Sequence, residues 1–162
     1  MAALLTSVLD NTGKVIEYTA ECQRMGIRVL PPDINASDAG FTVEGKDIRF
    51  GLLALKNVGR NLIATVVRER SGTPYRSLYD FCKRLHGTEI NRRAVESMIK
   101  SGAFDNLEAK RRSMMDGVEG ILKSVESEAR RNLDGQIDLF GALDGEQESG
   151  RNVYKLPDSG EE

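Results

Sequence analysis

This chain of 162 residues has 40% hydrophobic and 30% charged residues, enough for one ordinary hydrophobic core or two small ones. Its two cysteines, Cys22 and Cys82, lie far apart without a ligand partner and there is one histidine, which argues against disulfide and zinc frameworks. The net charge is −2, no apolar run approaches membrane-spanning length and residues 1–9 lack signal-peptide flanks, so we expect a cytoplasmic protein.

The chain opens with two predicted helices. Apolar residues at helical spacing predict the first over residues 4–9 and the second over residues 12–25. Asp10-Asn11-Thr12 offers a cap for the second helix, and Gly26 lies where a helix stops.

Short strands come after these helices. Residues 27–30 predict one strand, which ends at Pro31 because proline cannot continue a hydrogen-bonded ladder. Alternating side chains in residues 41–44 and 47–50, on either side of a glycine turn, predict a β-hairpin. Because so few short strands are marginal alone, we expect residues 1–51 to form a small α/β unit that packs onto the rest of the chain.

Residues 52–131 lose the β signals and follow helical periods. Their apolar faces predict helices over residues 60–70, 77–85, about 91–102 and about 109–131. Asn91 can cap the third helix and Gly102 can close it. Residues 132–162 are rich in Gly, Glu and Asp and predict a flexible acidic tail. The expected fold is mainly α with a small α/β portion.

The charges are segregated along the chain. Residues 1–55 carry 5 Lys and Arg against 7 Asp and Glu, residues 56–131 carry 16 against 10, and residues 132–162 carry 2 against 8. A basic block suits a phosphate-binding surface, since each neutralised phosphate releases condensed counterions. The alternative is a set of solvated helix faces, which charge alone leaves open.

A tight turn precedes the first helix of the basic block. Backbone N–H groups and the helix dipole at such a turn favour a phosphate without reading any base. Gly59 lets the backbone approach a ligand closely, and Asn57 tolerates a positive φ. We expect DNA contacts from this turn and from the helix that begins after Asn91, at Lys56, Asn57, Val58, Gly59, Arg60, Asn61, Arg92 and Arg93.

This turn resembles the helix-hairpin-helix element of DNA-binding proteins that do not read sequence. The pattern of that element has two glycines around an apolar residue, and Asn57 stands in place of the first glycine. Residues 90–105 resemble a degenerate second copy without the glycine turn. The plainer alternatives are an ordinary pair of antiparallel helices for the first copy and a packing role for the second, which would complete a four-helix unit.

A short motif lies in the acidic tail. Leu139 and Phe140 are large apolar anchors in a segment that is poor in them, and the Gln136 amide can hydrogen-bond at the rim of a pocket. The motif resembles the pentapeptide by which bacterial replication proteins bind the β sliding clamp. We therefore expect a clamp contact from Gln136, Ile137, Asp138, Leu139 and Phe140. The alternative is an apolar patch that folds back onto the helices.

The order of these segments resembles the bacterial DNA polymerase III α subunit. The resemblance rests on Met1–Thr6, Asp10–Thr12, Glu21-Cys22, Met25-Gly26, Leu30–Asn35, Lys56–Gly59, Asn91–Arg93, Ser101–Asp105 and Gln136–Phe140. It covers nearly the whole chain except about the last twenty residues. It implies distal fingers over residues 1–51, a tandem helix-hairpin-helix module over residues 52–131, and a tail with a clamp-binding motif over residues 132–162.

The resemblance also implies which partners this segment has and which catalytic groups it lacks. Duplex DNA, the β sliding clamp and the rest of the α subunit are the expected partners, with no membrane. The resemblance implies a parent that is a DNA-directed DNA polymerase, a nucleotidyltransferase of DNA replication, with palm aspartates that hold Mg²⁺ in an upstream part of the subunit. We therefore expect no catalytic residue, metal or cofactor here, and Asp33, Asp38 and Asp105 to serve in caps, turns and surface.

Two other classes of function are weighed against this one. A stand-alone scaffold module would bind protein partners through its tail and use the basic helices only for solubility. A small hydrolase would need a nucleophile, a base and an oxyanion site, and the sequence has no such arrangement.

Overall fold

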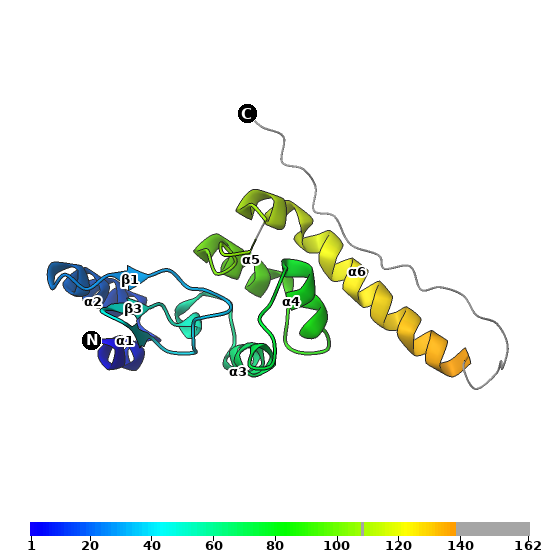
Figure 1. The fold of residues 1–162 in the computed structure, drawn as a ribbon, viewed down its shortest axis with the longest axis horizontal. Coiled ribbons are helices and arrows are strands. Elements are labelled where there is room, and N and C mark those ends of the chain that lie inside the picture. The colour runs from blue at the N-terminus through cyan, green and yellow to red at the C-terminus, as the bar shows by residue number, and fades with distance from the viewer. Residues whose placement is uncertain (108, 139–162) are drawn as a thin grey trace, which may run out of the picture.

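The computed structural model describes residues 1–107 and 109–138. The elements run in the order α1 (Ala2–Ser7), α2 (Thr12–Arg24), β1 (Val29–Leu30), β2 (Thr42–Glu44), β3 (Asp47–Arg49), a 3₁₀ turn η1 (Leu52–Ala54), α3 (Arg60–Arg70), α4 (Leu78–Arg84), α5 (Arg92–Ser101) and α6 (Arg111–Asp138). Figure 1 shows the α/β unit at one end of the molecule and α6 extending at the other. The predicted fold class, mainly α with a small α/β portion, is confirmed. Within the described residues, no helix is both long and apolar enough to span a bilayer.

Both predicted N-terminal helices are present. α2 matches its predicted bounds to within one residue, whereas α1 begins and ends two residues earlier than the predicted range of 4–9. The Asn11 side chain accepts a hydrogen bond of 3.1 Å from the amide of Lys14 and so caps α2. Gly26 comes after the helix with a φ of 75°, the left-handed conformation that glycine adopts without steric conflict. Local sequence therefore determines where α2 begins and where it ends.

The strands form one small sheet with β3 in the middle. β2 and β3 are the predicted hairpin and pair antiparallel, with Val43 opposite Ile48. β1 pairs with the other edge of β3 in parallel, with Val29 also opposite Ile48. The sheet and the two helices enclose a small hydrophobic cluster of Leu5, Val15, Cys22, Phe41 and Ile48.

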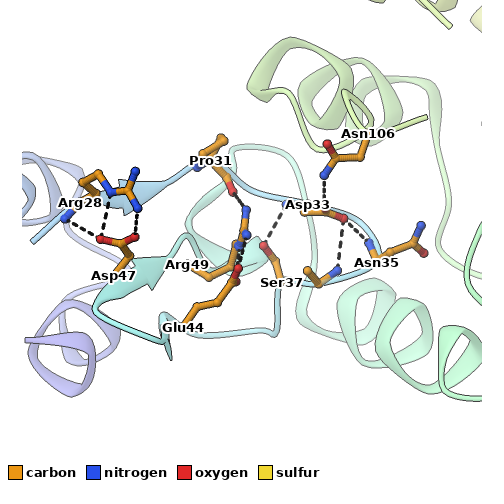
Figure 2. Close-up of polar contacts among 10 residues, drawn as sticks. Arg28, Pro31, Asp33, Asn35, Ser37, Glu44, Asp47, Arg49 and Asn106 are labelled. Carbon is orange, nitrogen blue, oxygen red and sulfur yellow. Dashed lines mark hydrogen bonds and ion pairs between the residues drawn. The ribbon is translucent and has the colours of Figure 1, made fainter. Parts of the chain in front are cut away.

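An ion pair closes one end of the sheet. Asp47 accepts hydrogen bonds from Arg28, at 3.2 Å from Nε and 2.5 Å from Nη2, and a further one from the Arg28 amide at 3.3 Å (Figure 2). The hydrogen bonds from the Arg28 side chain hold the pKa of Asp47 below its usual range, although desolvation opposes them. The pair thus ties the residue before β1 to the first residue of β3.

We expect Asp47→Asn to lower the thermal unfolding temperature at pH 7, because it breaks the charged hydrogen bonds with Arg28. A depressed pKa gives stabilisation that is present above the pKa of an unfolded aspartate, about 3.9, and is lost as the pH falls through the folded pKa. The difference between wild type and variant, followed by circular dichroism, should therefore be smaller at pH 3 than at pH 7. Glu17→Gln removes an exposed carboxylate from α2 and is the control, with little change expected. A difference of equal size at both pH values would contradict this role.

Helices α3 to α6 share one larger hydrophobic core. Tyr75, Phe81 and Phe104 meet edge to face within it, with ring centroids 5.0 and 5.1 Å apart. Asn91 caps α5 by accepting from the amide of Ala94 at 3.0 Å, and Gly102 ends that helix at a φ of 89°, both as predicted. The core is completed by the buried face of α6, which carries Met114, Val118, Ile121 and Val125.

The last helix runs further than the sequence analysis predicts. α6 ends at Asp138, whereas the pattern places its end near residue 131 and a flexible tail from residue 132. Residues 132–138 are therefore helical, which corrects the predicted boundary. This stretch contains no proline, and a single glycine, Gly135, costs a helix only about 1 kcal/mol.

A connector segment, residues 33–38, joins the α/β unit to the helical module. Asp33 is buried, and its carboxylate accepts from the amides of Asn35 at 2.7 Å and Ala36 at 3.2 Å and from the side chain of Asn106 (Figure 2). The Ser37 hydroxyl accepts from the Asp33 amide at 2.9 Å. Asp33 therefore shapes a turn, the role that the sequence predicts, and also holds the loop that carries residue 106.

The connector segment is also bonded to more distant parts of the module. Asn35 exchanges two hydrogen bonds with the backbone of Tyr75, at 2.8 and 2.9 Å. The Ile34 amide donates to the Ala103 carbonyl at 2.8 Å, and the Arg70 guanidinium donates to the Ile34 carbonyl at 3.0 Å. The Ile34 side chain is buried in the core of the helical module. The first third of the chain therefore contacts the helices through this segment.

Candidate nucleic-acid interface

The predicted phosphate turn lies between η1 and α3. Asn57 has a φ of 61° and is the one residue other than glycine with a positive φ in the described part of the chain. Gly59 has an extended conformation, with a φ of −79°, and is the N-cap of α3 without a side chain to cap it. The turn therefore needs conformational freedom at Asn57, where the helix-hairpin-helix pattern has its first glycine, and not at Gly59.

The segment that precedes the turn is shorter than an α-helix. η1 is a single 3₁₀ turn, whose first residue, Leu52, is fully buried in the core of the helical module. Val58 is half-buried and packs against the same core. These two contacts anchor the turn on both sides of Asn57, so its outer surface is held in one place.

Hydrogen bonds bring the turn beside α5. The Asn57 side chain donates to the Ser97 hydroxyl at 3.2 Å, and the Asn61 side chain donates to the Glu89 carboxylate at 2.9 Å. Glu89 lies two residues before Asn91, the N-cap of α5. The start of α3 therefore lies next to the start of α5, which brings together the two groups of predicted contact residues, 56–61 and 92–93.

The predicted basic residues differ in whether an acidic group neutralises them. Arg60 lies 3.7 Å from Asp10 in an exposed pair. Arg92 lies 2.6 Å from Glu96 and 3.1 Å from Glu119, and Glu96 above all raises the pKa of Arg92.

Lys56 and Arg93 are exposed and have no acidic partner within 4.0 Å among residues 1–107 and 109–133, whose side chains the structure describes. A paired arginine already has a counter-charge, so it gains less from a phosphate than an unpaired cation does. Lys56 and Arg93 are therefore the predicted residues best able to bind phosphate.

Two residues that contact the predicted residues 57 and 61, Ser97 and Glu89, are missing from the sequence prediction. Ser97 and Lys100 lie four and seven positions after Arg93 on α5, so all three lie on one helical face. That spacing was readable in the sequence. Glu89 became relevant only when the fold placed it against α3.

The described residues contain no cluster of His, Cys, Asp or Glu that could hold a metal ion. Asp38 pairs with Arg70 at 2.7 Å, and Asp105 pairs with Arg111 at 2.6 Å, which lowers the pKa of Asp105. Cys82 is buried, and burial raises its pKa to about 12, so its thiol is not a nucleophile at neutral pH.

The predicted clamp-binding motif lies at the edge of the described region. The backbone of residues 136–138 forms the end of α6. The side chains of these residues, together with Leu139 and Phe140, lie outside the described residues.

Comparison with known proteins gives one family match and a consistent set of relatives. The sequence pattern of the family described as "Helix-hairpin-helix motif" matches residues 26–114, more than half of the chain. The matched region contains the sheet, the turn at Asn57 and helices α3 to α5.

The relatives are proteins named DNA polymerase III subunit alpha. The chain is 47% identical over 146 residues to the protein of Saccharopolyspora erythraea, which covers 89% of the chain and 12% of the relative. It is 40% identical over 156 residues to that of Haemophilus influenzae and 39% identical over 156 residues to that of Escherichia coli, each covering 95% of the chain. The chain spans about 12–14% of the length of these relatives.

Proposed function

Because the chain belongs to the helix-hairpin-helix motif family, we propose that its helical module contacts the backbone of duplex DNA without reading sequence. The observation that carries this proposal is the turn at Asn57. It has its positive φ at the family's first glycine position and leads into a helix N-terminus without a side-chain cap. Backbone amides and a helix dipole at such a turn favour a phosphate oxygen. Lys56 and Arg93, which have no acidic partner among the described side chains, add charge beside it.

The module would serve within a DNA polymerase III α subunit. The support is the 39–47% identity to such subunits over most of the chain. Template-directed DNA synthesis by the parent would use carboxylates and Mg²⁺ that belong to other parts of the subunit. The task of this segment would then be to hold the duplex near that centre.

We propose a second contact, with the β sliding clamp, through the motif Gln136 to Phe140. It is supported by the sequence of the motif and by its place directly at the end of α6. One short peptide gives modest affinity, because ordering it opposes part of the contact energy. A module bound to the same duplex raises the effective concentration of the motif at the clamp, so a weak contact suffices.

The DNA contact is tested by a matched pair of double variants. We expect Lys56→Ala with Arg93→Ala to weaken duplex binding on the order of tenfold at low salt, to a similar extent on unrelated sequences. It should also reduce the slope of log affinity against log salt by about two, one for each lost phosphate contact. Arg60→Ala with Arg92→Ala removes the same charge from residues that are already paired, and should reduce the slope by less than about one.

Fluorescence anisotropy with two unrelated duplexes, at salt concentrations from about 50 to about 200 mM, measures both quantities. Equal slopes for the two double variants would mean that pairing with an acidic group does not decide which of these cations contact phosphate. If the wild type fails to bind duplex at low salt, the proposed DNA contact is wrong. The alternative, a scaffold module that binds protein partners through its tail, is then favoured.

A further inference from the structure

We propose that Glu89 competes with DNA phosphate for the N-terminal end of α3 and so limits the affinity of the turn for duplex. This inference rests on the proposed DNA contact and adds a residue that opposes it. One carboxylate oxygen of Glu89 accepts from the Asn61 side chain at 2.9 Å. The other lies 3.5 Å from the position that a Cβ atom would take at Gly59. The carboxylate therefore lies directly against the first residues of α3.

The loop that carries Glu89 is held by its own hydrogen bonds. Gly87 has a φ of 83°, and the Thr88 hydroxyl donates to the Leu85 carbonyl at 2.6 Å. The Asn91 side chain donates to the Glu89 carbonyl at 3.3 Å, while its oxygen caps α5. The backbone of Glu89 is thus fixed relative to both helices, so its side chain is presented to α3 by the fold.

The surroundings of Glu89 attract an anion. α3 and α5 both begin beside it, and each helix N-terminus carries a partial positive charge of about half a unit. No Lys or Arg lies within 4.0 Å of the Glu89 carboxylate in the described part of the chain. Its hydrogen bond comes from the Asn61 side-chain amide, and the partial positive charge of the helix end attracts it further. A phosphate oxygen would use the same two groups.

Glu89 and a phosphate cannot both occupy this place. They present the same kind of acceptor oxygen to the same donors, and two negative charges this close repel. The Glu89 side chain is exposed and unbranched, so it can turn into solvent when DNA approaches. When DNA binds, a phosphate then replaces the Glu89 carboxylate at the start of α3. The binding free energy that the turn contributes is therefore the difference between its interaction with phosphate and its interaction with Glu89.

The test is Glu89→Gln, which removes the charge and keeps an oxygen that can accept from Asn61. Compared with the wild type, it should bind duplex about three- to tenfold more tightly at low salt. The slope of log affinity against log salt should change little, because a phosphate takes the place of the Glu89 side chain in both proteins. Glu126→Gln removes an equal charge from α6, away from the turn, and should leave the affinity nearly unchanged.

Two results would overturn the inference, and they differ in what they say of the DNA contact. If the wild type binds duplex and the two glutamine variants have the same affinity, Glu89 exerts only a general charge effect and the DNA contact stands. If neither the wild type nor Glu89→Gln binds duplex at low salt, the proposed DNA contact fails and the inference fails with it. Thermal unfolding of both variants checks that the fold is unchanged.

Discussion

Replacing Ile34 by alanine is expected to lower the free energy of unfolding by about 2 to 5 kcal/mol. Ile34 belongs to the connector segment, yet its side chain is 1% exposed and lies in the core of the helical module. Alanine removes three carbon atoms from a site whose backbone is fixed by hydrogen bonds to Ala103 and Arg70. Because that backbone cannot move inward, the space left behind stays partly unfilled, which adds to the lost burial.

Urea unfolding, followed by circular dichroism, measures the Ile34→Ala effect. Val43→Ala is the matched control, since Val43 is also a β-branched apolar residue of the N-terminal third but is 72% exposed. We expect it to change the free energy of unfolding by less than about 0.5 kcal/mol. Similar losses in the two variants would show that Ile34 is not a core residue of the module.

Replacing both Leu139 and Phe140 by alanine is expected to abolish clamp binding and to leave duplex affinity nearly intact. The two side chains are the large apolar groups of the proposed motif, and a short peptide has few other groups to hold it in an apolar cleft. Losing both anchors removes most of a contact that is already modest. The charged surface around Asn57 is unchanged, so the DNA contact should persist.

Calorimetry with a bacterial sliding clamp and DNA titration on the same preparation give both affinities. Val153→Ala with Tyr154→Ala removes two large apolar groups from the same part of the chain, outside the motif, and should leave clamp binding intact. Clamp affinity that is unchanged in the Leu139 and Phe140 variant would exclude this motif as the contact.

The features that sequence predicts well here depend on a few neighbouring residues. Asn11 and Asn91 cap the helices that begin after them, and Gly26 and Gly102 end helices with a positive φ. The hairpin around Gly45 was likewise readable, because alternation and a glycine turn specify it within about ten residues. Local chemistry decides such features before any tertiary contact forms.

The features that sequence missed depend on residues that are far apart along the chain. The parallel pairing of β1 with β3 and the bonds between Asn35 and Tyr75 join segments that no local pattern relates. The predicted end of α6, near residue 131, was wrong. The helix propensities of the residues after 131 are nearly balanced against a non-helical chain, so composition alone does not decide between a helix and a flexible tail.

The candidate interface was predictable in its location but not in its charge balance. The turn and the start of α5 were both named from sequence, and the fold brings them together. The pairing of Arg92 with Glu96 was readable, because the two lie four residues apart on one helix. The pairs Arg60–Asp10 and Arg92–Glu119 were not readable, because their partners lie far apart along the chain. The opposing carboxylate of Glu89 was hidden for the same reason.

The connector segment has a mechanical consequence. A hinge needs a stretch of backbone whose dihedral angles can change without breaking contacts. Residues 33–38 instead are bonded to the end of α3, to the loop at Tyr75 and to the loop at residues 103–106. They therefore act as a rigid joint. Any hinge between the sheet and the helical module would therefore have to lie outside residues 33–38.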